Sequence, residues 1–240
     1  MKILILTFGS TGDVLPYIAL GKGLIERGHN VVICSNSRFE KVIIQHGLDY
    51  AYMSDEITQL IESTMGRNIL EDLNGFVGFF KSIFKLINKL GPLQQEILEN
   101  TWTAAQQHKP DLIIFSPKNC PAVHFAEKLN ITAMAAPLFP QFVPTSEYPA
   151  LGFPKFIQSS RYNRFTYRVV HRLSSIIGGK YLKKWRKDNG LQPAFCGVDI
   201  CHDSASNLIP VINGYSSSLI KIPADCPKSV YTTGFWFLEQ

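Results

Sequence analysis

The stretch from Phe8 to Tyr17, FGSTGDVLPY, holds the residues of this sequence that are best suited to chemistry. It places two small hydroxyl residues, Ser10 and Thr11, beside Gly12 and one acid, Asp13, directly after the apolar run KILILT. Three kinds of structure use such residues: a loop that cradles phosphate, a turn that caps a helix, and a carboxylate that accepts a proton.

Two nucleotide-binding motifs are excluded in this loop. A P-loop requires GxxxxGK[ST], but here Gly21 and Lys22 are followed by Gly23. A dinucleotide fingerprint requires GxGxxG, but the loop offers only Gly9 and Gly12, and no acid ends the next apolar run, NVVICS. A Rossmann-type oxidoreductase is therefore disfavoured, although a helix N-terminus here would still attract an anion.

Asp13 has two interpretations that are compatible with each other. It precedes a helical pattern with Pro16 in the first turn, which is typical of a helix cap. It also follows a buried strand, where a carboxylate at the edge of a cleft can take a proton from an attacking hydroxyl. A nearby helix N-terminus would keep that carboxylate ionised at neutral pH.

The five cysteines favour reduced thiols in a cytoplasmic protein. They are odd in number, form no CxxC pair, and follow no secretory signal or membrane-spanning run. Cys196, Cys201 and His202 lie close together in CGVDICHD, but their spacing is not that of a zinc site. We therefore expect neither a metal nor another cofactor.

Apolar periodicity predicts an alternating series of strands and helices. Strands are expected at 2–7, 30–35, 48–53, 111–116, 131–138, 207–213 and 228–234. Helices are expected at 14–27, 37–47, 119–129, 161–177 and 180–189, with a long helical stretch at 56–108 interrupted near 66–68, 74–75 and 91–92. This order predicts an α/β, Rossmann-like, doubly wound parallel sheet. Ligands of such sheets bind beyond the carboxyl ends of the strands, where the loops 8–13, 116–120 and 137–154 lie.

The first forty residues resemble a known family. The segment GSTGDVLPYIALGKGLIERGHNVVICSNSRFEKVIIQHGLDY is similar to the start of GT-B-fold glycosyltransferases of the sterol-glucosyltransferase and antibiotic-glycosyltransferase type, which carry the family 28 N-terminal domain. KWRKDNGL (184–191) resembles a tryptophan-containing helix of sterol-type members, and VYTTGFWF (230–237) resembles the segment that leads into the second domain. The resemblance covers nearly the whole chain and implies the N-terminal half of a GT-B fold.

The resemblance also implies an activity. Members transfer a sugar from a nucleotide diphosphate sugar to an acceptor hydroxyl with inversion, so this sugar would be a co-substrate and no metal would be required. Asp13 matches the proposed general base, and Ser10, Thr11 and Gly12 match the loop near the donor phosphates. Thr11 replaces a common Arg, and the strand at 111–116 is followed by no acid, whereas members with a His base carry one there.

The same resemblance predicts the domain organisation. Residues 1–234 would form the acceptor-binding domain, 235–240 would begin an interdomain linker, and the nucleotide-sugar domain of a GT-B enzyme is absent from this chain. That domain would follow in a longer protein or come from a partner subunit, and the chain alone would then be inactive. The alternative is a non-catalytic binding or membrane-recruiting module that pairs with a separate catalytic subunit.

Two aromatic segments could contact an apolar acceptor such as a sterol, lipid or polyketide. FVGFFKSIFKLINKLG (76–91) is amphipathic and contains Phe79 and Phe80 opposite a row of lysines. The proline-rich loop at 137–154 carries Phe139, Phe142 and Tyr148 beside the expected cleft. Core packing of the helix and of the loop is the alternative in each case.

Positive charge is concentrated in one segment. Residues 161–187 contain nine Lys or Arg and no acid, which leaves 15 of the 24 basic residues against 19 acidic residues elsewhere. Arg161, Arg164, Arg168 and Arg172 are expected on one helix face, and the apolar Phe165, Val169 and Leu173 on another. This face could be solvated, meet a second domain, or contact an anionic membrane. Nucleic acid is not expected, because the rest of the surface is acidic and no nucleic-acid motif occurs.

Overall fold

The computed structural model describes the backbone of residues 1–62, 76–140, 142–150, 152–177 and 179–238. It describes the side chains of the same residues except 61, 76–90 and 177. The helix interruptions expected near 66–68 and 74–75 lie outside the described residues.

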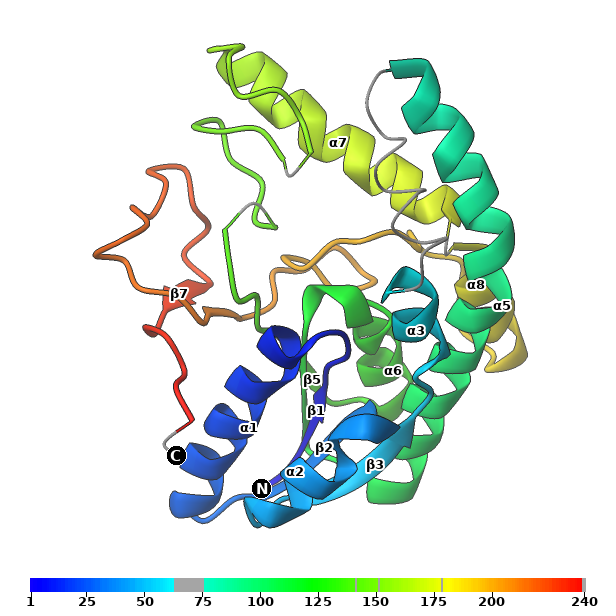
Figure 1. Ribbon diagram of the computed structural model, residues 1–240, viewed down its shortest axis with the longest axis vertical. Helices are drawn as coiled ribbons and strands as arrows, with labels where there is room; N and C mark the ends of the chain where they lie inside the picture. Colours follow the sequence, from blue (N-terminus) through cyan, green and yellow to red (C-terminus); the bar gives the residue numbers. More distant parts are fainter. Residues whose placement is uncertain (63–75, 141, 151, 178, 239–240) are drawn as a thin grey trace.

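The described strands form one parallel sheet of seven strands in the order β3-β2-β1-β4-β5-β6-β7 (Figure 1). The strands are β1 (Lys2–Leu6), β2 (Asn30–Asn36), β3 (Asp49–Met53), β4 (Leu112–Phe115), β5 (Thr132–Ala135), β6 (Val211–Asn213) and β7 (Val230–Thr232). The chain adds strands outward from β1 to β3 and then returns to β4 on the other side of β1. The predicted doubly wound α/β fold is therefore confirmed.

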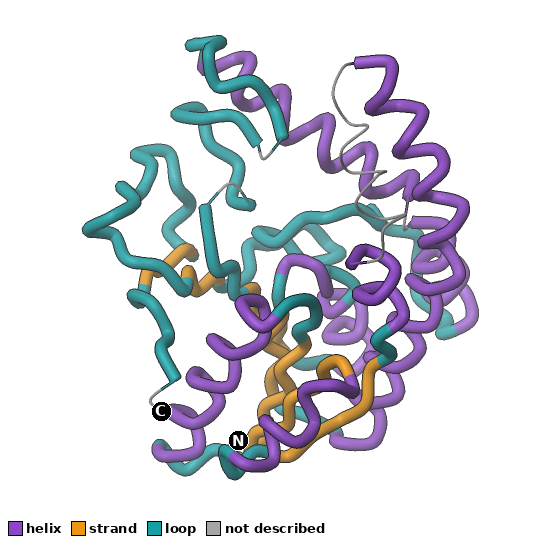
Figure 2. The backbone as a smooth tube through the Cα atoms, viewed as in Figure 1, coloured by secondary structure: helices purple, strands orange, loops and turns teal. Residues whose placement is uncertain are grey.

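Helices alternate with these strands and cover the sheet (Figure 2). The α-helices are α1 (Thr11–Glu26), α2 (Glu40–Gln45), α3 (Glu56–Glu62), α5 (Phe76–His108), α6 (Ala122–Leu129), α7 (Ser160–Ile177) and α8 (Gly179–Asp188). Two single 3₁₀ turns, η1 (Ser37–Phe39) and η2 (Pro117–Asn119), precede α2 and α6.

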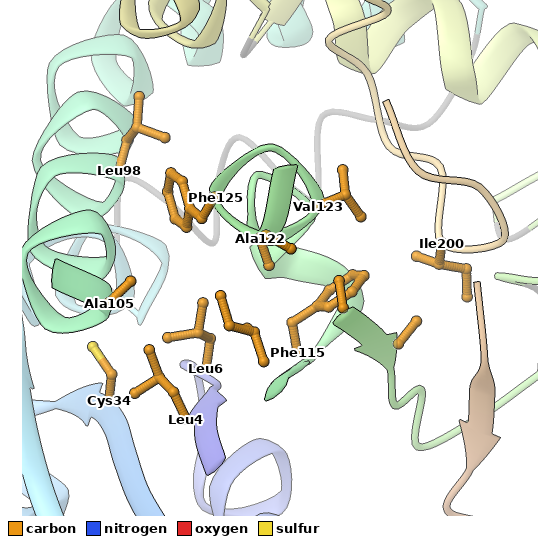
Figure 3. Packing of buried hydrophobic residues seen from close by; sticks show 14 of the residues in the cluster. Leu4, Leu6, Cys34, Leu98, Ala105, Phe115, Ala122, Val123, Phe125 and Ile200 are labelled. Atoms are coloured by element: carbon orange, nitrogen blue, oxygen red, sulfur yellow. The ribbon is translucent and has the colours of Figure 1, made fainter. Parts of the chain in front are cut away.

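The continuous apolar run of β1 is explained by a core on each side of the sheet. Leu4 and Leu6 belong to one buried cluster, which includes Leu98 and Ala105 of α5 and Phe125 of α6 (Figure 3). Ile3 and Ile5 belong to the other cluster, with Val14, Tyr17 and Ile18 of α1 and Ile43 of α2. Strand residues alternate between the two faces, so a strand buried on both faces must be apolar throughout.

Several expected boundaries were wrong, among them those of 37–47, which is divided into η1 and α2, and of 131–138, where β5 ends at Ala135. α1 begins at Thr11, three residues earlier than predicted, so Gly12 and Asp13 lie within its first turn. α5 continues through Gly91 and Pro92, where Gly91 is buried against the side chain of Tyr181. The segment 119–129 is divided into η2 and α6. β6 and β7 contain three residues each, and Pro210, which has no N–H group to donate, directly precedes β6.

In the described residues, no helix combines the length and apolar character that crossing a bilayer requires. The expected faces of α7 were wrong for Phe165, which is exposed together with Arg161, Arg168 and Arg172.

Candidate active site at the switch point of the sheet

The strand order reverses between β1 and β4, and the two loops that leave these strands lie side by side. The Ser116 N–H donates to the carbonyl of Leu6 at 2.9 Å, which keeps the two strand ends in register. The loop after β1 leads to Asp13, and the loop after β4 contains Lys118. In doubly wound sheets, this reversal opens a crevice at the carboxyl edge, which is the usual ligand site.

Asp13 closes the N-terminal turn of α1. Ser10 is the N-cap residue, and both its backbone N–H and its hydroxyl donate to Oδ2 of Asp13, at 2.8 and 2.9 Å. The Asp13 N–H donates in turn to the carbonyl of Ser10 at 2.9 Å. Asp13 is therefore not a cap that precedes the helix but its third residue, which forms a capping box with Ser10, and these contacts also fix the direction in which the carboxylate points.

The second carboxylate oxygen faces Lys118. Lys118 Nζ lies 2.8 Å from Oδ1 of Asp13, and the two side chains are 42% and 26% exposed. Burial raises the pKa of Asp13, but the Lys118 ammonium and the Ser10 donors together lower it by more than burial raises it. The net pKa therefore lies below its ordinary value. Asp13 is therefore ionised at neutral pH and remains accessible from the cleft.

Gly9 allows the close approach of these groups. Its φ of 133° lies in the region that favours glycine, and a Cβ there would lie 2.4 Å from Asp13 Oδ2 and 2.7 Å from Lys118 Nζ. The buried Asn36, at the end of β2, accepts the Gly9 N–H at 2.9 Å and donates to the carbonyl of Ser54 at 2.9 Å. Arg38 donates to the carbonyl of Gly9. The loop is thus held from β2 in the conformation that brings Asp13 and Lys118 together.

Two cavities adjoin this pair. The smaller is lined by Asp13, Tyr17, Leu138, Phe139, Phe142 and the segment 116–118. The larger has a volume of about 430 Å³, within the ~300–1,000 Å³ of small-molecule pockets. Its walls come from Phe8, α3, α5, the segment 118–121, Ser174 of α7, α8 and residues 196–198. Most of its described lining residues are apolar, and Lys118 is the charged one among them. Lys118 therefore borders both cavities while it contacts Asp13.

The structure brings some of the predicted site residues together. Phe139 and Phe142 contact each other with ring centroids 4.9 Å apart, and both line the small cavity with Asp13. Ser10, Thr11 and Gly12 are exposed at the N-terminus of α1. Tyr148 is half-buried and lines neither of these two cavities. The side chains of Phe79 and Phe80 lie outside the described residues.

Sequence reasoning missed Lys118, Gly9 and Asn36. Lys118 is the charged residue of a loop expected at the carboxyl edge, so its proximity to the cleft was a usable signal. The pairing of Lys118 with Asp13 could not be predicted, because this contact depends on β4 lying next to β1. Gly9 contributes through its positive φ, and Asn36 contributes through a hydrogen bond to Gly9 from 27 residues away. Neither feature can be recognised from the sequence pattern.

The structure offers no cluster of metal ligands among the described residues. Groups of three His, Cys, Asp or Glu side chains arranged to hold an ion are absent from that part of the chain. His202 instead pairs with Asp199 at 3.0 Å, and Cys196 and Cys201 are buried free thiols.

Comparisons with known structures agree with this fold. A glycosyltransferase of kitacinnamycin superposes with a TM-score of 0.59 at 16% identity and covers all of this chain and 52% of its own. The calicheamicin glycosyltransferase CalG4 gives 0.56 at 13% identity, over 97% of this chain and 51% of its own. Identities this low show a shared fold alone, which agrees with the predicted N-terminal half of a GT-B fold.

Sequence comparisons add the family. Sterol 3-beta-glucosyltransferases of Aspergillus fumigatus and Debaryomyces hansenii are 31% and 30% identical to this chain, over 100% and 98% of its length. The chain spans only 16% and 14% of those relatives. The sequence profile of the glycosyltransferase family 28 N-terminal domain matches residues 3–148. With this match over more than half of its length, the chain belongs to the glycosyltransferase family 28 N-terminal domain family.

Proposed function

We propose that this chain is the acceptor-binding domain of an inverting glycosyltransferase that glycosylates a hydroxyl of an apolar, sterol-like acceptor. The observation that carries the proposal is an ionised, accessible carboxylate at the switch point, paired at 2.8 Å with Lys118, which lines an apolar cavity of about 430 Å³. The family match and the sterol glucosyltransferase relatives support it.

In this proposal Asp13 is the general base, and Oδ1 is the oxygen that accepts the proton. Oδ2 already accepts two hydrogen bonds from Ser10, whereas Oδ1 has Lys118 as its partner and keeps a further lone pair. As Oδ1 takes the hydroxyl proton, the acceptor oxygen attacks the anomeric carbon from the face opposite the leaving group. The bond from that carbon to the phosphate oxygen breaks, the nucleoside diphosphate leaves, and the configuration inverts.

The donor would approach the N-terminus of α1. The first N–H groups of a helix have no intrahelical partner and stabilise an anion, so the exposed Ser10, Thr11 and Gly12 suit contacts to a diphosphate. One structural neighbour, the glycosyltransferase SsfS6, was solved with thymidine diphosphate bound.

Most donor contacts would come from a second domain that follows residues 1–234. Residues 235–238 pass beside α1, where the Trp236 and Tyr17 rings lie 5.8 Å apart, and would lead toward the linker. We call the chain joined to that domain the complete enzyme.

The five free cysteines suit a reducing compartment such as the cytoplasm.

The acceptor would occupy the large cavity and extend its hydroxyl past Lys118 toward Asp13. Phe8, Ile97 and Leu182 provide apolar walls there, and Phe139 and Phe142 provide an aromatic wall on the other side of Asp13. Contacts from Phe79, Phe80 and Tyr148 remain predictions.

Blocking the cavity tests this placement. Val198→Trp puts an indole at a partly buried position of the cavity wall, so we expect acceptor affinity to fall at least about tenfold. The measurement is a fluorescence titration of the chain with a fluorescent sterol. Leu219→Trp adds the same side chain at a position that is 76% exposed and should bind like the wild type.

Three results would contradict the placement. They are unchanged affinity in Val198→Trp, equal losses in both variants, or no sterol binding by the wild-type chain.

A further inference from the structure

Lys118 has more hydrogen-bond donors than its described partners use. Its Nζ lies 2.8 Å from Asp13 Oδ1 and 5.8 Å from the centroid of the Phe8 ring. An ammonium group carries three N–H donors, and no second oxygen among the described residues accepts one of them. The side chain is also 42% exposed, so at least one donor remains for a ligand.

The turn η2 fixes the backbone at Lys118. Pro117 and Asn119 on either side of it are buried, whereas Lys118 is exposed. The Asn119 N–H donates to the carbonyl of Ser116 at 2.7 Å, and the Asn119 amide donates to the Ser116 hydroxyl at 3.3 Å. The end of β4 therefore holds Lys118 at the cleft before any ligand binds, which lowers the entropy lost when a substrate is oriented.

The pair formed by Lys118 and Asp13 offers a place for one further oxygen atom. Because Nζ and Oδ1 are 2.8 Å apart, an oxygen in the cleft can lie within about 3 Å of both. A hydroxyl fits this place, since it donates its proton to Oδ1 and accepts from Nζ with a lone pair. A carboxylate fits less well, because Asp13 already matches the charge of Lys118 and a second anion would be left unmatched.

We propose that Lys118 is a second catalytic residue, whose ammonium donates a hydrogen bond to the acceptor oxygen while Asp13 takes the proton of that hydroxyl. This inference rests on the proposed function and adds to its mechanism. The hydroxyl proton passes to Oδ1, and the oxygen lone pair that Lys118 leaves free forms the bond to the anomeric carbon. The electron pair of the broken bond leaves with the nucleoside diphosphate, and Lys118 keeps its three protons throughout.

This role explains how a weak base can act at the cleft. Burial raises the pKa of Asp13, and the Lys118 ammonium is among the groups that lower it by more than that, which keeps Asp13 ionised but weakens it as a base. A hydrogen bond from the same ammonium to the acceptor oxygen makes the hydroxyl a stronger acid. The two effects offset each other, whereas a lysine that touched Asp13 alone would only weaken the base.

The pH profile of Lys118→Met in the complete enzyme separates these two roles. Methionine is of similar length and has neither the charge nor the donors. Without the ammonium the pKa of Asp13 should rise, so the acid limb of the kcat/KM profile should move to higher pH. Above that limb Asp13 is ionised in both enzymes, and there kcat/KM should stay about 10–100-fold lower in the variant, because a charged hydrogen bond is lost. Lys118→Arg keeps a charged donor and should recover most of this loss.

A binding measurement gives a second readout that needs no turnover. A sterol and its analogue without the acceptor hydroxyl would each displace a fluorescent sterol from the complete enzyme. The ratio of their affinities should fall about tenfold in Lys118→Met, because the analogue offers Lys118 no oxygen. Lys128→Met is the matched control. It removes the same charge and a 2.7 Å contact to the carbonyl of Asn189 at the last turn of α6, and it should match the wild type in every readout.

Two results would overturn the proposal. One is a Lys118→Met enzyme whose kcat/KM above the acid limb equals or exceeds that of the wild type, because Lys118 would then act through Asp13 alone. The other is an equal loss of affinity for the sterol and for its analogue. The proposed function is judged separately, by whether the wild-type enzyme forms the glycoside, so the two failures are distinguishable.

Discussion

Asp13→Asn in the complete enzyme should lower the turnover number by about 10²–10⁴-fold, because it removes the proton acceptor and keeps the size of the side chain. Asparagine can still accept the Ser10 hydrogen bonds, and it caps helices about as well as aspartate. The lost pair with Lys118 is partly exposed, so the free energy of unfolding should fall by no more than about 1 kcal/mol. Acceptor affinity should stay near that of the wild type.

The pH dependence follows from the same contacts. A general base acts in its ionised form, and the pKa of Asp13 lies below its ordinary value. Wild-type kcat/KM should therefore hold its value as pH falls through mildly acidic conditions, and drop only near or below the usual carboxylate range. Asp49→Asn is the matched control, since Asp49 is exposed at the start of β3, at the other end of the strands. A turnover number near wild type in Asp13→Asn would remove Asp13 from the mechanism.

Gly9→Ala should lower turnover about 100-fold and destabilise the fold by roughly 1–3 kcal/mol. The new methyl group would lie 2.4 Å from Asp13 Oδ2 and 2.7 Å from Lys118 Nζ, so at least one of these groups must move. The φ of 133° adds backbone strain that an alanine cannot relieve without changing the loop. Steady-state kinetics of the complete enzyme and thermal unfolding of the chain measure the two effects.

Gly23→Ala is the matched control for that substitution. Gly23 lies within α1 and a Cβ there meets nothing within 4 Å, so alanine should stabilise the helix by up to about 1 kcal/mol. If Gly9→Ala left turnover and stability unchanged, as Gly23→Ala should leave turnover, the proposed close packing around Gly9 would be contradicted.

Most of the fold could be predicted because its first strands are decided locally. The central parts of these strands, ILIL (3–6) and VVIC (31–34), are short, wholly apolar and flanked by polar residues, as strands buried on both faces must be. β6 and β7 were predicted too long, since their ends are set by Pro210 and by pairing with neighbours. α5 continues through Gly91 and Pro92 because tertiary packing against Tyr181 outweighs two poor helix formers.

The site was only partly predictable. Asp13 could be placed at the carboxyl edge of the sheet because its position depends on a strand, a turn and a helix that are consecutive in the sequence. Lys118 and Asn36 lie next to the loop after β1 because β4 and β2 both pair with β1. The apolar pattern of the sequence does not specify this strand order. The large cavity draws on α3, α5 and α8 together with residues 196–198, so its lining could not be inferred from any one segment.

The most direct test of the central claim is the structure of the product. The complete enzyme would be incubated with a nucleotide diphosphate sugar of α configuration and a sterol, and the anomeric proton of the product examined by NMR. The proposed role of Asp13 predicts a sterol β-glycoside formed together with one nucleoside diphosphate. A product that keeps the α configuration, or an enzyme that binds both substrates and forms no glycoside, would contradict it.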